Sequence, residues 1–191
     1  MAMTTLLDLS AYRTYALDEN IHHKPGNDLR AAPHGLCILA DIPFQLEGLI
    51  QLSSKVSHEK TGQSFPESAV GIPVEATSKR MHFLQSASWR GTDGSVIGEY
   101  RVHYADGDVA LIPIVYGHSV VDWCFTKGDP LPTGAAVAWN GANERTQKLG
   151  QLIQVYAFTW HNPRPDAPIA TLDFVSFGEE SAPFLMSVTL D

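Results

Sequence analysis

The sequence predicts an all-β fold, an antiparallel β-sandwich, on three observations. Several short segments alternate apolar and polar residues with the period of two that is typical of a strand with one buried face. Turn-forming residues separate these segments, most clearly at Asp106-Gly107. No segment has the apolar period of a long amphipathic helix. Eight or so short strands with turns between them are typical of a sandwich or jelly roll.

The chain of 191 residues is expected to form one domain, because β-sandwiches reach this length without splitting. It contains no internal repeat and no low-complexity linker, so residues 1–191 are treated as a single unit. Residues 1–35 show no sustained period and are expected to be an irregular arm that wraps the domain, with a short strand over residues 5–9.

Regular strands are expected to begin at Leu36. Residues 36–40 are an apolar run, and residues 42–52 continue in strand-like composition. Residues 79–89 alternate, which predicts a strand with one buried face and places Trp89 in the core.

A β-hairpin is expected around Asp106-Gly107, because a type I′ turn requires positive φ at both central residues. Its strands cover residues 100–104 and 109–116. Pro113 removes a donor from the second strand and so predicts an edge position or a bulge.

The rest of the chain continues the pattern. Residues 62–71 and 117–134 are expected to be loops, and a helical turn is expected near residues 143–149. Further strands are predicted over residues 135–139, 151–160, 169–177 and 184–190.

Charge and hydropathy exclude several kinds of partner. The formal net charge is −8, and no cluster of Lys and Arg offsets it locally, so nucleic acid is not an expected partner. No apolar run approaches the roughly 18 residues that span a bilayer, so we expect no membrane insertion. The first ten residues show no signal peptide, which leaves the compartment open between the cytoplasm and a secreted protein whose leader was trimmed.

Patterns for catalysis and metal binding are weak. Cys37 and Cys124 lie in apolar segments and are expected to be unpaired core thiols. The eight histidines lack the ligand spacing of a cupin site, and no Gly-x-Ser-x-Gly elbow occurs. The adjacent Glu179 and Glu180 are expected to lie in a solvated turn. We therefore predict no catalytic residue, no metal ligand and no cofactor.

The tryptophans suggest a ligand. Trp123, Trp139 and Trp160 fall at predicted strand ends or in loops, and indole rings can stack on the apolar face of a sugar. Asp122, Asn143 and Arg145 are the candidate hydrogen-bonding groups beside them, with Asn140 as a further one. The alternative is that the tryptophans pack the ends of the sandwich.

From Ile72 to its end the chain resembles bacterial accessory domains of the galactose-binding-like, jelly-roll class, which includes discoidin domains and many carbohydrate-binding modules. The segments that carry the resemblance are Met81-His82-Phe83-Leu84, Tyr100 to Gly107, Ile112 to Gly117, Asp122-Trp123, Trp139, Trp160 with Asn162-Pro163 and Pro165, and Asp173 to Ser176. About two thirds of the chain is covered. The resemblance implies the fold more specifically than it implies a ligand.

The resemblance also implies a structural Ca²⁺ as one alternative, with Asp93, Asp106, Asp108 and Asp129 as its oxygen donors. Isolated aspartates in loops more often stabilise turns. The resulting hypothesis is a non-catalytic, carbohydrate-binding module. Its alternative is a domain that binds a protein partner or a second copy of itself through an exposed sheet face or edge.

Overall fold

A computed structural model describes residues 4–191, and the chain is mostly antiparallel β, with 48% strand and 9% helix. The predicted all-β class is therefore confirmed. The strands are β1 (Thr5–Leu6), β2 (Tyr15–Ala16), β3 (Gly35–Leu39), β4 (Ile42–Leu46), β5 (Gly48–Gln51), β6 (Ser68–Ala76), β7 (Arg80–Ser88), β8 (Val96–Tyr104), β9 (Val109–Val115), β10 (Cys124–Phe125), β11 (Ala136–Gly141), β12 (Leu152–His161), β13 (Ile169–Ser176) and β14 (Ala182–Leu190). The helices are α1 (Ser57–Thr61), α2 (Glu144–Lys148) and the 3₁₀ turns η1 (Ser10–Tyr12) and η2 (Ile21–His23).

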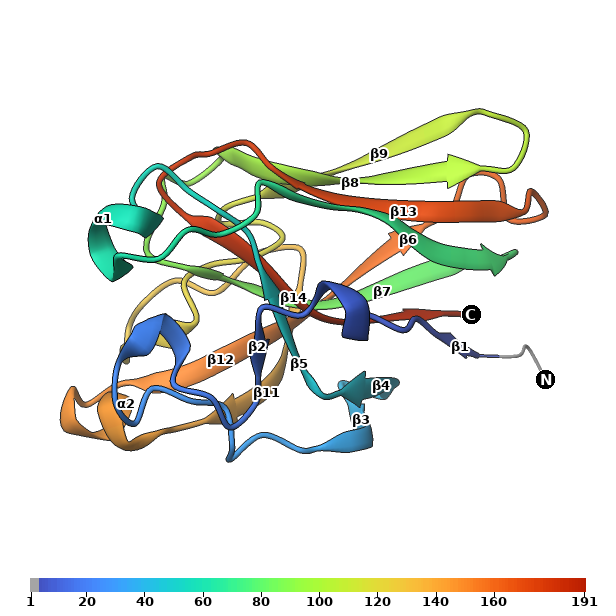
Figure 1. Cartoon of the computed structure of the whole chain (residues 1–191). Coiled ribbons are helices and arrows are strands. Elements are labelled where there is room, and N and C mark those ends of the chain that lie inside the picture. The colour runs from blue at the N-terminus through green and yellow to red at the C-terminus, as the bar shows by residue number, and fades with distance from the viewer. Residues whose placement is uncertain (1–3) are drawn as a thin grey trace.

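Two sheets and a separate hairpin make up the fold (Figure 1). The larger sheet has the order β10-β12-β7-β14-β5-β2, with β1 also paired to β14 and β11 to β12. The smaller sheet has the order β6-β13-β8-β9 and lies along the top of Figure 1. The β3–β4 hairpin forms a two-stranded sheet of its own.

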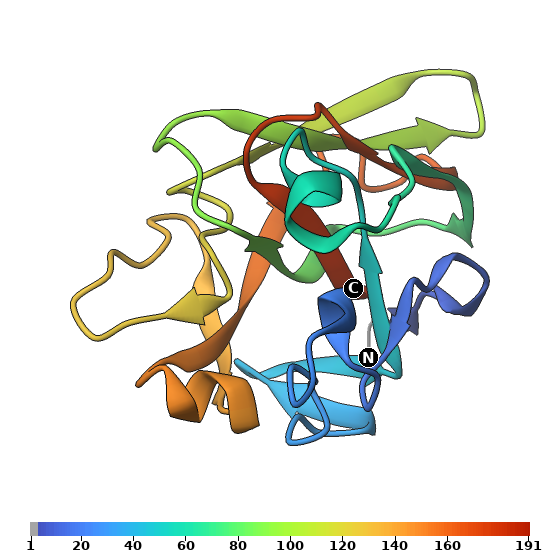
Figure 2. The same cartoon turned by 60° about the vertical axis from the view of Figure 1, so that its left-hand side comes forward.

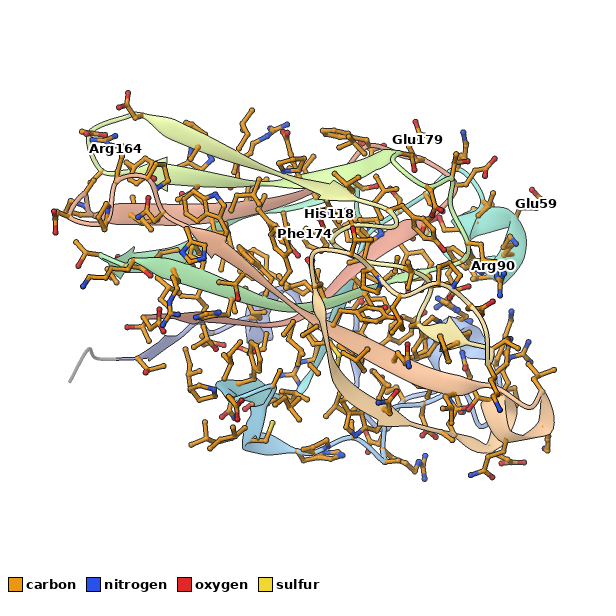
Figure 3. All side chains as sticks on the ribbon, turned by 180° about the vertical axis from the view of Figure 1, so that it is seen from behind. Glu59, Arg90, His118, Arg164, Phe174 and Glu179 are labelled. Atoms are coloured by element: carbon orange, nitrogen blue, oxygen red, sulfur yellow. The ribbon has the colours of Figure 1, made fainter. Side chains whose placement is uncertain are left out.

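The main core lies between the two sheets. Phe83 of the larger sheet stacks on Tyr100 of the smaller one with 4.1 Å between ring centroids, and Phe174 continues the stack at 5.1 Å. Figure 3 shows Phe174 in this central position. The Tyr100 hydroxyl donates to Gln85 Oε1 at 2.6 Å, so the buried phenol has a partner.

A second core covers the opposite face of the larger sheet. Leu84, Val155 and Phe184 of that sheet pack there against residues of the N-terminal arm, which include Leu17 and Leu29. The β3–β4 hairpin contributes Leu39, Phe44 and Leu46 to the same cluster. Figure 2 shows the arm and the hairpin together beneath the larger sheet. The molecule therefore has three layers, and the arm is one of them.

The second core corrects the prediction for residues 79–89. The alternation was right, but the expectation of one exposed face was wrong, because every residue of β7 from Met81 to Ser88 is buried. β7 lies between β12 and β14 in the larger sheet, and the arm covers the face that carries its polar side chains. Trp89 lies one residue beyond β7 and is half-buried, so its placement inside a core strand was also wrong.

The predicted β8–β9 hairpin is confirmed, but the expected type I′ turn was wrong, because Gly107 has φ +97° whereas Asp106 does not have positive φ. β9 is an edge strand, as Pro113 indicated. Sequence reasoning missed β6, α1 and the tight turn at Ala40 and Asp41. Among residues 4–191, no helix is long and apolar enough to cross a membrane.

Candidate functional site

The structure does not bring the six predicted site residues together. Trp139 on β11 packs against the second core, whereas Trp160 on β12 packs against the main core. These two indoles thus lie on opposite faces of the larger sheet and cannot form one platform. Trp123 is 3% exposed and meets Phe184 edge to face at 5.8 Å, so neither face of its ring is open to a ligand.

Asn143 and Arg145 lie at α2, and the Asn143 side chain is engaged in the fold. Asn143 Oδ1 accepts from Thr146 N at 2.8 Å, and Thr146 Oγ1 accepts from Asn143 N at 2.9 Å, which is a reciprocal helix cap. Asn143 Nδ2 donates to Asp28 O at 2.9 Å and so ties α2 to the arm. Arg145 is half-buried, and its backbone N–H donates to Gly26 O at 3.2 Å.

Three of the four aspartates proposed as calcium ligands pair with arginines. Asp106 and Asp108 both pair with Arg164, whose guanidinium also lies 4.6 Å from the centre of the Tyr104 ring. Asp129 pairs with Arg90. Within the described residues, no three His, Cys, Asp or Glu side chains are grouped closely enough to hold a metal ion.

Two of the predicted residues line cavities: Asn143 lines one of about 370 Å³ beside α2, and Asp122 lines a cleft. This cavity of about 400 Å³ lies at the end of β7 beside α1, and we name it the Trp89 cleft. It is lined by Val56, Lys60, Trp89, Arg90, Asp122 and Glu180. A smaller cavity of about 130 Å³ adjoins it and shares Arg90 and Asp122. In Figure 3, Arg90, Glu179 and Glu59 of α1 mark this end of the molecule, and Arg164 marks the opposite end.

The backbone sets the position of Trp89 at the cleft. Trp89 has φ +70°, a region that a bulky residue seldom adopts and that recurs at binding sites. Its carbonyl accepts a hydrogen bond from Ser181 Oγ at 2.7 Å. The chain turns there out of the sheet, so the indole leaves the strand direction and reaches the cleft.

His22 of the arm supports the indole from one side. The two rings stack with 4.9 Å between centroids and 18° between planes. His22 thus covers one face of the half-buried Trp89, which also lines the cleft. His22 itself is buried, has φ +61°, and its Nε2 lies 2.8 Å from Gln51 Oε1. Burial lowers the pKa of His22 to about 4, so the supporting ring is neutral at pH 7.

Asp122 is the perturbed acid of the site. Its segment runs beside the end of β7, with Trp123 N donating to Ala87 O at 2.9 Å. Burial raises the pKa of the Asp122 carboxyl to about 6, although the N–H of Cys124 on Oδ1 and the charge of Arg90 lower it in part. The guanidinium of Arg90 is itself held by both carboxylate oxygens of Asp129, at 2.8 and 2.7 Å. A carboxyl with a raised pKa in a cleft is a candidate for function.

The rim of the cleft adds exposed charges of both signs. Lys60 lies at the last turn of α1, and Glu180 lies in the loop before β14. This loop and the α1 segment are joined by Lys55 N donating to Glu179 O at 3.1 Å and by the Lys55–Glu179 ion pair at 3.3 Å. The cleft is therefore lined by a tryptophan together with hydrogen-bond donors and acceptors.

The cavity of about 470 Å³ beneath residues 6–10 has a different chemistry. It is lined by aliphatic residues of β5 and β14, such as Ile50 and Leu185, and it contains no aromatic side chain. Its rim carries the Arg13–Glu47 ion pair at 3.2 Å. Because it offers no ring on which a ligand could stack, we place the candidate site at the Trp89 cleft.

Sequence reasoning found Asp122 but missed Trp89, His22 and Arg90 as site residues. The available signal was the run Trp89-Arg90-Gly91, which ends the β7 pattern with an aromatic and a cation. The contact with His22 joins positions 67 residues apart and left no local trace. Comparison with known proteins gives no assignment, since no family model and no curated protein matches the chain.

Proposed function

We propose that this chain is a non-catalytic binding module whose ligand is a carbohydrate, held in the Trp89 cleft. The observation that carries the proposal is Trp89, which lines this cavity and whose indole stacks on His22. A pyranose ring presents an apolar C–H face that stacks on an indole and hydroxyls that need partners around it.

The polar groups suit a polyhydroxylated ligand better than a charged one. Asp122 and Glu180 accept hydrogen bonds, while Lys60 and Arg90 donate them. Because the cleft carries both positive and negative side chains, it does not favour an anionic or a cationic ligand. Hydroxyl groups, which both donate and accept hydrogen bonds, can pair with side chains of either charge. The resemblance to the galactose-binding-like class points to the same kind of ligand and stays a prediction.

Calorimetric titration with a panel of neutral and acidic polysaccharides tests the proposal. We expect Trp89→Ala to weaken binding at least tenfold, because a buried stacking contact is worth more than about 1.4 kcal/mol. Trp139→Ala, which removes a half-buried indole outside the cleft, is the matched control and should leave the affinity unchanged.

Two results would contradict the proposal. One is the absence of binding to any glycan of the panel by folded protein. The other is binding that persists in Trp89→Ala while far-UV circular dichroism shows the native fold, since the ligand would then lie elsewhere.

A further inference from the structure

The β3 strand has an unusual free edge. β4 is its only strand neighbour in the described part of the chain, and the hairpin lies at the lower border of the molecule in Figure 1. Its side chains Leu36 and Ile38 are 68% and 74% exposed, the highest values among the large apolar residues of residues 4–191. They project from the same face of the strand, because side chains alternate.

The backbone of this edge is also free. In an antiparallel hairpin with a two-residue turn, residues beside the turn form a hydrogen-bonded pair, and such pairs alternate with unbonded ones. Leu39 and Ile42 form the hydrogen-bonded pair beside the turn, so the backbone of Cys37, two residues earlier, also bonds to β4. Leu36 and Ile38 lie at the alternate positions and direct their N–H and C=O groups away from β4, toward the free edge. Gln45, opposite Leu36, likewise sends its N–H away from β3, to Ser187 Oγ at 3.2 Å.

The usual protection of an edge strand is missing here. Natural edges carry proline, lysine or inward charges that prevent pairing with another chain. The two edge strands of the smaller sheet follow this rule, with Pro73 in β6 and Pro113 in β9. β3 has the sequence GLCIL, without proline or charge.

We propose that β3 pairs antiparallel with β3 of a second copy of this chain, so that the protein forms a two-fold symmetric dimer. With the axis at Cys37, Leu36 of one copy lies opposite Ile38 of the other, and both pairs exchange their free N–H and C=O groups. The four exposed apolar side chains then meet on one face as cross-strand pairs.

The ends of the strand complement each other in the same register. His34 of one copy lies opposite Ala40 of the other and next to Asp41, which places a basic ring beside a carboxylate; in the single chain His34 Nε2 lies 3.3 Å from Arg30 O. Both His34 and Asp41 are exposed in the single chain. The proposal is independent of the Trp89 cleft, which lies at the end of β7.

Analytical ultracentrifugation of the full chain, from micromolar to millimolar concentration in about 0.15 M NaCl to screen charge, provides the test. We expect a species of twice the 20.9 kDa monomer that grows with concentration. Ile38→Lys should raise the dissociation constant of the dimer at least tenfold. Leu111→Lys, at a 58% exposed leucine of edge strand β9, should leave the dissociation constant unchanged. A chain that stays monomeric throughout, or a dimer that survives Ile38→Lys, would overturn the proposal.

Mixtures of charged variants test the register of the pairing. Because they are expected to gain a heterodimer, a variant that merely unfolds cannot give the expected result. In the proposed pairing Leu36→Lys faces Ile38→Glu, so these two variants should form a heterodimer at concentrations where each alone is monomeric. A mixture of Leu36→Lys with Leu36→Glu brings no opposite charges face to face and should stay monomeric. A heterodimer in the second mixture but not in the first would refute this register.

Discussion

At the scale of single residues, Asp122 couples the stability of the fold to pH. Its carboxyl has a pKa of about 6 in the folded protein and about 3.8 when exposed, so the folded state binds the proton more tightly. The stabilisation by protonation is complete below pH 3.8 and is lost as the pH rises through 6. We therefore expect Asp122→Asn to flatten the pH dependence of unfolding in this window and to raise stability at pH 7, as measured by urea denaturation.

The affinity of the Trp89 cleft should change in the opposite direction. An ionised carboxylate accepts stronger hydrogen bonds from hydroxyls than a protonated one does. Binding of the carbohydrate is thus expected to strengthen between pH 5 and pH 7 in the wild type, with a midpoint near 6. Titrations of Asp122→Asn should show weaker and pH-independent binding. An equally steep pH profile in that variant would assign the effect to another group.

The side chain of Asn143 already makes hydrogen bonds within the fold, which should be visible in the stability of the protein. Its side chain caps α2 and donates to Asp28 O, so Asn143→Ala removes a helix cap and a buried hydrogen bond. We expect a loss of about 1–3 kcal/mol in the free energy of unfolding. Gln147→Ala, at an exposed position of the same helix, is the control for helix propensity and should change stability by less than about 0.5 kcal/mol.

At the scale of elements, the β3–β4 turn is strained in a way that can be measured. Ala40 and Asp41 have φ of +49° and +62°, as a type I′ turn requires, but alanine is poorly suited to this region. Replacing Ala40 by Asn, which tolerates positive φ, should raise stability by about 0.5–1 kcal/mol. The same measurement on Gly107→Ala, at φ +97° in the β8–β9 turn, should show a loss. A destabilised Ala40→Asn protein would show that the alanine side chain itself is needed.

The contrast between these two turns explains what the sequence could predict. Asp106-Gly107 contains the glycine that its geometry needs, so the hairpin was evident from composition. Ala40-Asp41 has positive φ at both positions without a glycine, while the second core holds Leu39 and Phe44 beside it, and this long-range cause leaves no local signal. The same kind of long-range cause explains the error for β7. Its alternation was visible in the sequence, but the layer that buries its second face was not.

At the scale of the whole molecule, the site is assembled from distant segments. Residue type and strand pattern suggested an aromatic platform, and they identified Asp122 within it. They could not distinguish the four indoles, because burial depends on which face of the larger sheet each ring enters and on what the arm covers. The position of Trp89 at the cleft depends on the backbone, which leaves β7 at φ +70°, and on the stacking contact with His22 of the arm.

The arm should therefore behave as part of the core and of the site together. Leu29 is fully buried in the second core, so Leu29→Ala is expected to cost about 2–5 kcal/mol, like Leu172→Ala in the main core. Urea unfolding followed by far-UV circular dichroism and by tryptophan fluorescence should give coincident transitions for Leu29→Ala, since one cooperative unit contains both cores. If the fluorescence transition came first, with the dichroism unchanged, the arm would unfold on its own. His22 would then leave Trp89 before the sandwich opens, and the cleft would lose its ligand in that intermediate.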